Sequence, residues 1–378
     1  MIGAIRSWLW GAVGLIAFVM TGELVCRALP VSTATATAYR ISPLILTYPA
    51  HTQINTAAGW DLKNVQQLRT NNLGFVSDRD FTPDAHAVAL IGDSYVEASM
   101  LDANQRLGAQ LQLRLGPDRP VYAMGSPGTS LLDYAERVRY ASQQLAVRDF
   151  VIFIVAGDVH QSLCGSGNTH GPCLDRRSLA QTIELHVAPG ALKRAVRHSA
   201  FAQYLFSQLR VSLDKLLPTL LALPATLWPA RHTVKPVQQA KPVSPLAPEA
   251  VDAIINVFLE RIRPHVAGRL VLVINSPQPG ITPRTQDEDS WRLGTLAAAQ
   301  GATVVDMRAP YRAHAASSPL SLYVSPKDQH LNGLGLSLVA DAAAAAVKRS
   351  MPWPGMSGLG RPAVLPDAVP NAPSAARH

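Results

Sequence analysis

The most informative stretch of the chain is residues 88–97, which read VALIGDSYVE. Its apolar start predicts a buried strand over 87–91, and Gly92-Asp93-Ser94 predicts a tight turn into a helix. An esterase needs its serine nucleophile on such a turn at the end of a strand. The tripeptide is a weak signal by itself, because a serine after Gly-Asp is often only a turn residue or a helix cap.

A second motif lies near the other end of the chain, where residues 328–332 read DQHLN. Together the two motifs supply a nucleophile, an orienting carboxylate and a general base in the order Ser94, Asp328, His330. We predict that His330 takes the proton of Ser94 and that Asp328 orients the imidazole. The other interpretation of residues 328–332 is an ordinary loop and cap before the last helix.

Between the motifs, apolar strands alternate with amphipathic helices. Near-continuous apolar runs favour a parallel sheet that is buried on both faces. We therefore predict a three-layer α/β/α flavodoxin-like sandwich with a central parallel sheet of about five strands and a site at their carboxyl ends. The expected strands are 87–91, 121–124, 150–155, 269–275 and 302–306, and the expected helices are 101–115, 131–145, 251–266, 290–300 and 334–349.

The N-terminus predicts a membrane anchor. Residues 8–26, WLWGAVGLIAFVMTGELVC, are almost wholly apolar and about long enough to cross a lipid bilayer. Glu23 is the one charged residue inside the segment, and Arg6 and Arg27 flank it. We predict an uncleaved transmembrane helix with the body outside the cytoplasm. A signal peptide is the alternative, although its apolar core is usually shorter and ends in an Ala-x-Ala-like site.

The rest of the chain divides by composition. We expect an anchor over 1–29, a polar connector over 30–86, the α/β domain over 87–350 and a disordered Pro/Ala-rich tail over 351–378. Residues 179–215 favour a helix. A Pro-rich excursion covers 216–248, and its apolar first half, 216–230, contains three prolines that argue against a second span. This first half fits either a loop packed on the body or an interfacial segment.

Composition excludes some classes of function. The chain of 378 residues has a formal net charge of +8, but its Lys and Arg residues are scattered, so we expect no nucleic-acid partner. The Gly-rich loop at 164–173 lacks the Lys-Ser/Thr of a phosphate-binding loop, and we expect no cofactor. In an oxidising compartment Cys164 and Cys173 would close this loop as a disulfide. The alternative is a metal site that uses Cys164, His170 and Cys173.

These motifs and their spacing resemble the SGNH, or GDSL, hydrolase superfamily over roughly residues 71–348. The resemblance rests on Gly92-Asp93-Ser94, on GSPGTS at 125–130, on VAGDVH at 155–160 and on 328–330. It implies an oxyanion hole made by the backbone N–H groups of Ser94 and Gly128. The asparagine expected in the third block is missing, with Asp158 near its place and His160 or Asn168 as substitutes.

The resemblance implies a membrane-anchored serine esterase in the bacterial inner membrane, with its catalytic domain in the periplasm. The expected substrate is an acyl ester, with an O-acetyl group on a cell-surface polysaccharide as the leading case. One alternative is an O-acyltransferase that passes the acyl group from Ser94 to a sugar hydroxyl. Another is a catalytically degenerate scaffold that binds a glycan or a partner.

Overall fold

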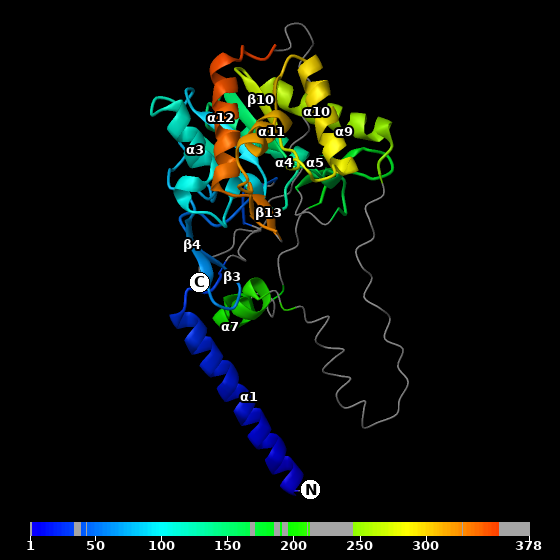
Figure 1. Ribbon diagram of the computed structural model, residues 1–378. Helices are drawn as coiled ribbons and strands as arrows, with labels where there is room; N and C mark the ends of the chain where they lie inside the picture. The colour runs from blue at the N-terminus through cyan, green and yellow to red at the C-terminus, as the bar shows by residue number, and fades with distance from the viewer. Residues whose placement is uncertain are drawn as a thin grey trace.

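The computed structural model has a layered α/β body and a long helix that extends away from it (Figure 1). It describes residues 2–33, 39–42, 44–166, 171–184, 190, 196–209, 211, 245–326 and 328–354. The Pro-rich excursion expected at 216–248 therefore lies outside the described residues up to 244, and the expected tail lies outside them from 355.

The body is built on one sheet of five parallel strands in the order β11-β10-β7-β5-β6. Counted along the chain this order is 2-1-3-4-5, which is the flavodoxin-like order, so the predicted fold is confirmed. The neighbours β5 and β7 form the switch point of this order, where ligands bind outside the carboxyl ends of the strands. The strands are β5 (Val88–Gly92), β6 (Val121–Gly125), β7 (Asp149–Ile154), β10 (Leu270–Ile274) and β11 (Thr303–Asp306).

Strand β7 shows why its sequence is apolar without alternation. Phe150, Ile152 and Ile154 belong to the core on one face of the sheet, whereas Val151 and Phe153 belong to the core on the other. Complete burial of one such side chain stabilises the fold by about 1.5–3 kcal/mol. Helices α4 (Leu131–Gln144), α9 (Pro248–Ile262) and α10 (Thr285–Ala299) cover the first face, and α3 (Leu107–Leu115), α11 (Arg308–Ser317) and α12 (Gly333–Arg349) cover the second.

The region expected to be a polar connector contains two antiparallel hairpins. Strand β1 (Tyr39–Ser42) pairs with β2 (Ile45–Thr47), and β3 (Gln53–Ala58) pairs with β4 (Lys63–Arg69). Before them lies α1 (Ile2–Ala28). Within the described part of the chain, α1 is the one helix long and apolar enough to cross a membrane, a test that an N-terminal signal sequence would also pass.

The middle of the chain differs from the helix expected over 179–215. Residues Gln181–Ile183 form β9, which pairs antiparallel with β8 (Pro172–Leu174). A helix is present later, as α7 (Ala200–Gln203) and a π-helical continuation over Tyr204–Gln208. The remaining short helices are α2 (Ser94–Glu97), α5 (Asp158–Gln161) and the 3-10 turns Ala103–Gln105 and Arg263–His265, and the last hairpin joins β12 (Tyr323–Ser325) to β13 (Asp328–Leu331).

Candidate active site

Ser94 begins α2 at the carboxyl end of β5. The side chain of Asp93 accepts a hydrogen bond of 2.9 Å from the backbone N–H of Tyr95 and so caps the short helix. The helix lies very close to the sheet, since a Cβ atom at Gly92 would lie 2.5 Å from Val96 and one at Gly125 would lie 2.5 Å from the backbone nitrogen of Glu97. Both strand ends therefore require glycine for the serine to sit where it does.

The hairpin β12–β13 brings His330 to the serine. Oγ of Ser94 lies 2.9 Å from Nε2 of His330, and Nδ1 of His330 lies 2.6 Å from Oδ1 of Asp328. The side chains of His330 and Asp328 are 30% and 36% exposed, so the site is open to a ligand from solvent. The three residues predicted from their order in the sequence thus form one continuous chain of hydrogen-bonding contacts.

Tyr95 holds the loop of His330 against the nucleophile turn. Its ring centroid lies 4.6 Å from that of the imidazole, and its hydroxyl donates a hydrogen bond of 3.1 Å to the backbone carbonyl of Gln329. The same ring lies 6.0 Å from Phe153 in strand β7. Tyr95 therefore positions His330, a role that the sequence analysis did not identify.

The loop after β6 is fixed by a buried arginine. The guanidinium of Arg137, on α4, donates hydrogen bonds to the backbone carbonyls of Gly92 at 2.6 Å and Met124 at 3.1 Å, and to Oγ1 of Thr129 at 2.9 Å. It thereby joins the ends of β5 and β6. Gly128 lies in this loop with φ of +70°, a left-handed conformation that glycine adopts without strain.

Asp158 begins α5 after strand β7, and its carboxylate is fully engaged within the protein. Oδ2 accepts from the backbone N–H of Val155 at 2.9 Å, and Oδ1 accepts from the hydroxyl of Tyr134 at 3.1 Å. Burial raises the pKa of Asp158 well above its usual value, and the nearby carboxyl of Asp93 raises it further. Burial likewise raises the pKa of Asp93 to about 6. These contacts give Asp158 a part in holding the loop after β7.

Gly157, which precedes Asp158, is the N-cap residue from which α5 begins after strand β7. Its φ of +105° is left-handed, and a Cβ atom built there would lie 2.9 Å from Nε2 of Gln161. Gln161 follows one helical turn later, where helix geometry places residues i and i+4 on one side. The side-chain amide of Gln161 therefore occupies the place of a side chain on residue 157.

The sequence also offered His160 and Asn168 as candidate donors to the oxyanion. Nε2 of His160 lies 2.8 Å from a carboxylate oxygen of Asp289 on α10, and both side chains are buried. His160 thus faces α10. Asn168 lies outside the described residues.

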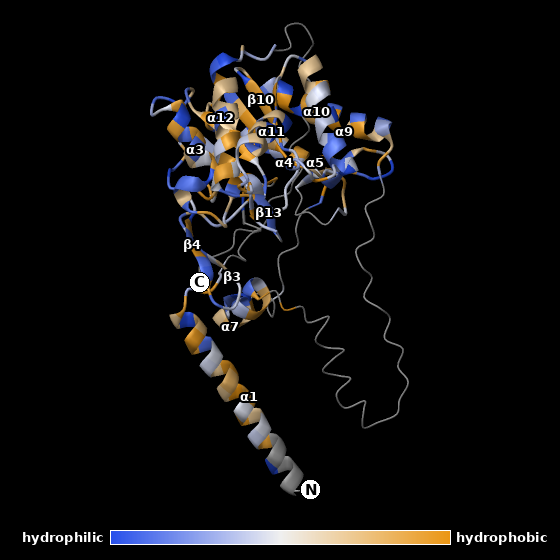
Figure 2. Cartoon of the chain, viewed as in Figure 1, coloured by the Kyte–Doolittle hydropathy of each residue, from blue (hydrophilic) through white to orange (hydrophobic). Residues whose placement is uncertain are grey.

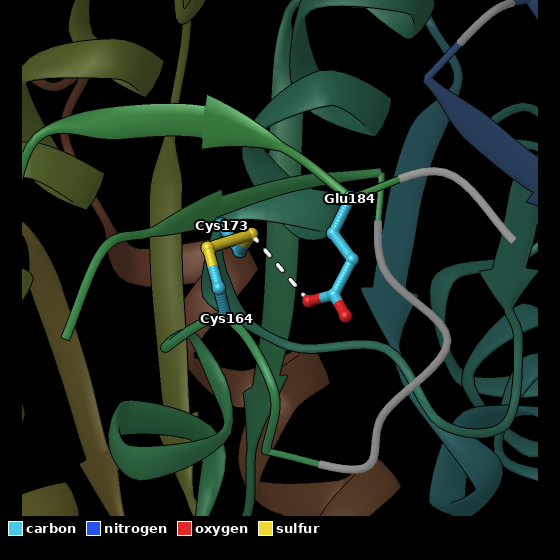
Figure 3. Close-up of side chains that lie close together, drawn as sticks. All are labelled: Cys164, Cys173 and Glu184. Atoms are coloured by element: carbon cyan, nitrogen blue, oxygen red, sulfur yellow. Dashed lines mark hydrogen bonds between the residues drawn. A yellow bond between two sulfur atoms is a disulfide. The ribbon is translucent and has the colours of Figure 1, made fainter.

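Cys164 and Cys173 are joined as a disulfide, with Cα atoms 5.1 Å apart (Figure 3). Glu184 lies beside the bond, with one carboxylate oxygen 3.9 Å from Sγ of Cys173 (Figure 3). The same oxygen accepts a hydrogen bond of 2.8 Å from the backbone N–H of Gly165. The three side chains are close enough to surround a cation, but thiolates are the zinc ligands and bonded sulfurs supply none. His170, from the alternative metal set, lies outside the described residues.

The sequence of the chain matches no family model and no curated protein. Among solved structures it is similar to a member of the lipolytic protein G-D-S-L family from Veillonella parvula, at 10% identity and a TM-score of 0.37, over 70% of this chain and 98% of that one.

Two further solved structures are similar to the chain. An acetyl xylan esterase from Geobacillus stearothermophilus has 13% identity and a TM-score of 0.38, over 71% of this chain and 98% of that one. A carbohydrate acetylesterase family member from Sinorhizobium meliloti has 13% identity and a TM-score of 0.32, over 69% of this chain and 97% of that one.

Proposed function

We propose that the protein is a serine esterase of the SGNH type that works through an acyl-serine intermediate. The observation that carries this proposal is the chain of contacts from Oγ of Ser94 to Nε2 of His330 at 2.9 Å and from Nδ1 of His330 to Asp328 at 2.6 Å. These distances suit proton transfer from a serine hydroxyl to an imidazole that a carboxylate orients.

In the proposed reaction, His330 accepts the proton of Ser94 while Oγ attacks the acyl carbonyl carbon. The tetrahedral intermediate then collapses, the alcohol leaves with the proton from His330, and the acyl group remains on Ser94. Water next attacks the acyl-serine with His330 as base, which releases the acid and restores the serine. Asp328 stabilises the imidazolium that forms in both steps.

Three donors serve the oxyanion in this proposal. The backbone N–H groups of Ser94 and Gly128 are the first two, from the ends of neighbouring strands β5 and β6. We assign the third to the side-chain amide of Gln161, which lies 2.9 Å from a Cβ atom built at Gly157. Asp158 is fully buried, and its carboxyl group is held by the backbone N–H of Val155 and the hydroxyl of Tyr134, so we do not assign it as a donor. Each such donor lowers the barrier by about 2.7–4 kcal/mol.

The proposed setting is the outside of a bacterial inner membrane, with α1 as the anchor and an O-acetyl ester of a cell-surface polysaccharide as the substrate. Two features support an oxidising compartment and a membrane. The disulfide between Cys164 and Cys173 is of a kind that persists outside the cytoplasm. Helix α1 carries a 20-residue apolar segment, Leu9–Ala28, of which only 6% is buried.

A fluorophosphonate probe tests the nucleophile assignment directly. We expect the full chain to gain one adduct, which peptide mass spectrometry locates on Ser94, and we expect Ser94→Ala to gain none. The matched control is Ser130→Ala, which changes a buried serine at the start of α4. An adduct on another residue, or an equal adduct in Ser94→Ala, would remove Ser94 from its proposed role.

A further inference from the structure

Glu23, the one acidic residue of helix α1, connects this helix to the first turn of α7. Glu23 accepts a hydrogen bond of 2.7 Å from Oγ of Ser199 and bonds of 3.1 Å from the backbone N–H groups of Ala200 and Phe201. These N–H groups belong to the first turn of α7, where a helix leaves its donors without internal partners. Phe18 lies edge-on to Phe201, with ring centroids 5.7 Å apart.

A glycine permits this contact. A Cβ atom at Gly22 would lie 3.0–3.1 Å from three atoms of the Phe201 ring, whereas one at Gly14 would have nothing within 4 Å. The packing of α1 on α7 therefore depends on the absence of a side chain at residue 22, and Gly14 provides a matched position on the same helix.

The β3–β4 hairpin makes two further connections to this region. After α1, the N–H of Thr33 donates to the carbonyl of Asn55 in β3 at 2.7 Å, and the N–H of Asn55 donates to Oγ1 of Thr33 at 2.9 Å. At the hairpin tip, Tyr204 donates to the carbonyl of Trp60 at 3.0 Å and Gln208 donates to that of Gly59 at 2.7 Å. The anchor, α7 and the hairpin form one packed unit.

The same hairpin contacts the segment that carries the nucleophile. Thr56 donates a hydrogen bond of 3.0 Å to the carbonyl of Ser99, and Asn64 donates one of 2.7 Å to that of Met100. Ser99 and Met100 closely follow α2, which begins at Ser94. A strand rises by about 3.3 Å per residue, and Thr56 lies only a few residues from the hairpin tip that contacts the region of α7. The hairpin therefore holds α2 at a distance on the order of 10–20 Å from α7.

The catalytic hairpin lies on the side of the body that faces the anchor. In Figure 1, β13, which carries His330, lies between the sheet and the level of α7, and α1 extends beyond α7. Figure 2 shows mostly orange and pale residues along α1, whereas the body mixes hydrophilic and hydrophobic residues. The strand that carries His330 and the expected membrane helix are thus on the same side of the body.

The bilayer surface is expected at about the level of Glu23. Glu23 and Arg27 form an ion pair of 2.7 Å, and charged groups are costly below the interface. Residues 2–22 of α1 span about 31 Å at about 1.5 Å per residue, enough for a hydrocarbon core of about 30 Å with Arg6 near the opposite interface. Trp60 is 78% exposed at the hairpin tip beside Tyr204, and both residue types favour the membrane interface.

We infer that the esterase proposed above faces the bilayer and takes an acyl ester that is itself held in the bilayer by a lipid tail. This inference rests on the proposed function. A substrate that is free in solution reaches the active site at any distance from the membrane, so a flexible anchor would be sufficient for such a substrate. A fixed height and orientation raise the effective concentration only of an ester that the same membrane presents.

The test uses the full chain in phosphatidylcholine vesicles with two fluorogenic esters. One is soluble 4-methylumbelliferyl acetate, and the other is the same coumarin acetate attached to a phosphatidylethanolamine headgroup. We expect Gly22→Leu to lower turnover of the lipid-held ester about tenfold and leave the soluble ester unchanged, because it separates α1 from α7. Gly14→Leu should match the wild type on both esters.

Equal turnover of the lipid-held ester by the wild type and Gly22→Leu would overturn the inference. Hydrolysis of the soluble ester through Ser94, with none of the lipid-held ester, would leave the esterase proposal standing and overturn this one. Hydrolysis of neither would overturn both.

A second measurement is independent of activity. A fluorophore attached at Trp60→Cys should be quenched by lipids with spin-labelled headgroups, because the hairpin tip lies at the interface. A fluorophore at Leu113→Cys on α3, where Leu113 is 81% exposed, should not be quenched. Equal quenching at the two positions, or none at residue 60, would contradict the orientation.

Discussion

The carboxylate of Asp328 lies 2.6 Å from Nδ1 of His330, although only one residue separates the two in the chain. Strand β13 explains how this close spacing works. Side chains at i and i+2 of a strand point to the same face, and Gln329 between them is exposed. The backbone N–H of His330 also donates to the same carboxylate at 3.1 Å. The extended backbone thus brings the acid to the imidazole.

We therefore expect Asp328→Asn to lower kcat/KM for p-nitrophenyl acetate by about 10²–10⁴-fold, because the amide no longer stabilises the imidazolium. KM should change little. Asp306→Asn is the control, since Asp306 pairs with Arg308 and does not contact His330. A full rate in Asp328→Asn would show that another group orients the base.

Gln161→Ala should lower kcat by about 10²–10³-fold with a small effect on KM, because the lost amide stabilises the oxyanion and not the ground state. Gln161→Glu should be as slow or slower, since a carboxylate repels the oxyanion. Gln143→Ala on the exposed side of α4 should keep the wild-type rate. Wild-type kcat in Gln161→Ala would remove this residue from the oxyanion hole.

Glu97 should make the protein less stable as pH rises. Burial raises its pKa from 4.5 to about 7, and among the described residues its Oε2 has no hydrogen-bond partner. The folded state thus binds the proton more firmly than the unfolded chain. This contribution to stability is fully present below pH 4.5 and is lost as pH rises through 7.

Glu97→Gln carries no such charge, so we expect it to lose less stability than the wild type between pH 5 and pH 8. The difference should be about 2–3 kcal/mol, at about 1.4 kcal/mol per pKa unit. Thermal unfolding at the two pH values measures it, with exposed Glu260→Gln as the control. Parallel pH profiles for wild type and Glu97→Gln would contradict the assignment.

The disulfide should stabilise the fold by constraining the loop between Cys164 and Cys173, which lie nine positions apart. Reduction is expected to lower the free energy of unfolding by about 2–4 kcal/mol. The Cys164→Ser/Cys173→Ser double variant should not respond to reductant, and Cys26→Ser should respond as the wild type does. In denaturant, one thiol should react before reduction and all three afterwards. Three reactive thiols before reduction would exclude the disulfide.

The sequence predicted the sheet well because burial on both faces leaves a strong signal. Each of the five expected strands overlaps an observed strand, and β7 was recognisable from its unbroken apolar run. Helix starts were less accurate. α10 begins at Thr285, five residues before the expected start, because the side chain of Asp287 accepts a hydrogen bond from the N–H of Arg284 and so caps a polar first turn. α3 begins only at Leu107.

Other features left no local signal. The hairpins β1–β2 and β3–β4 have short strands whose apolar and polar residues do not alternate clearly, and β2 is buried throughout whereas most of β4 is exposed. The contact of Glu23 with α7 joins residues 176 positions apart, which no local pattern predicts. The role proposed for Gln161 left only a weak signal in the sequence, because the residue lies outside the third block of the resemblance. The glycine at 157, followed by an amide at i+4, was the available signal.

The most direct test of the account is hydrolysis of p-nitrophenyl acetate by the full chain, measured beside Ser94→Ala and His330→Ala. The account predicts turnover by the wild type and a loss of at least about 10³-fold in each variant, because neither residue acts without the other. Undiminished turnover in Ser94→Ala would contradict it. So would a well-folded wild type with no turnover, and a scaffold that binds its ligand without chemistry would then take the place of the esterase.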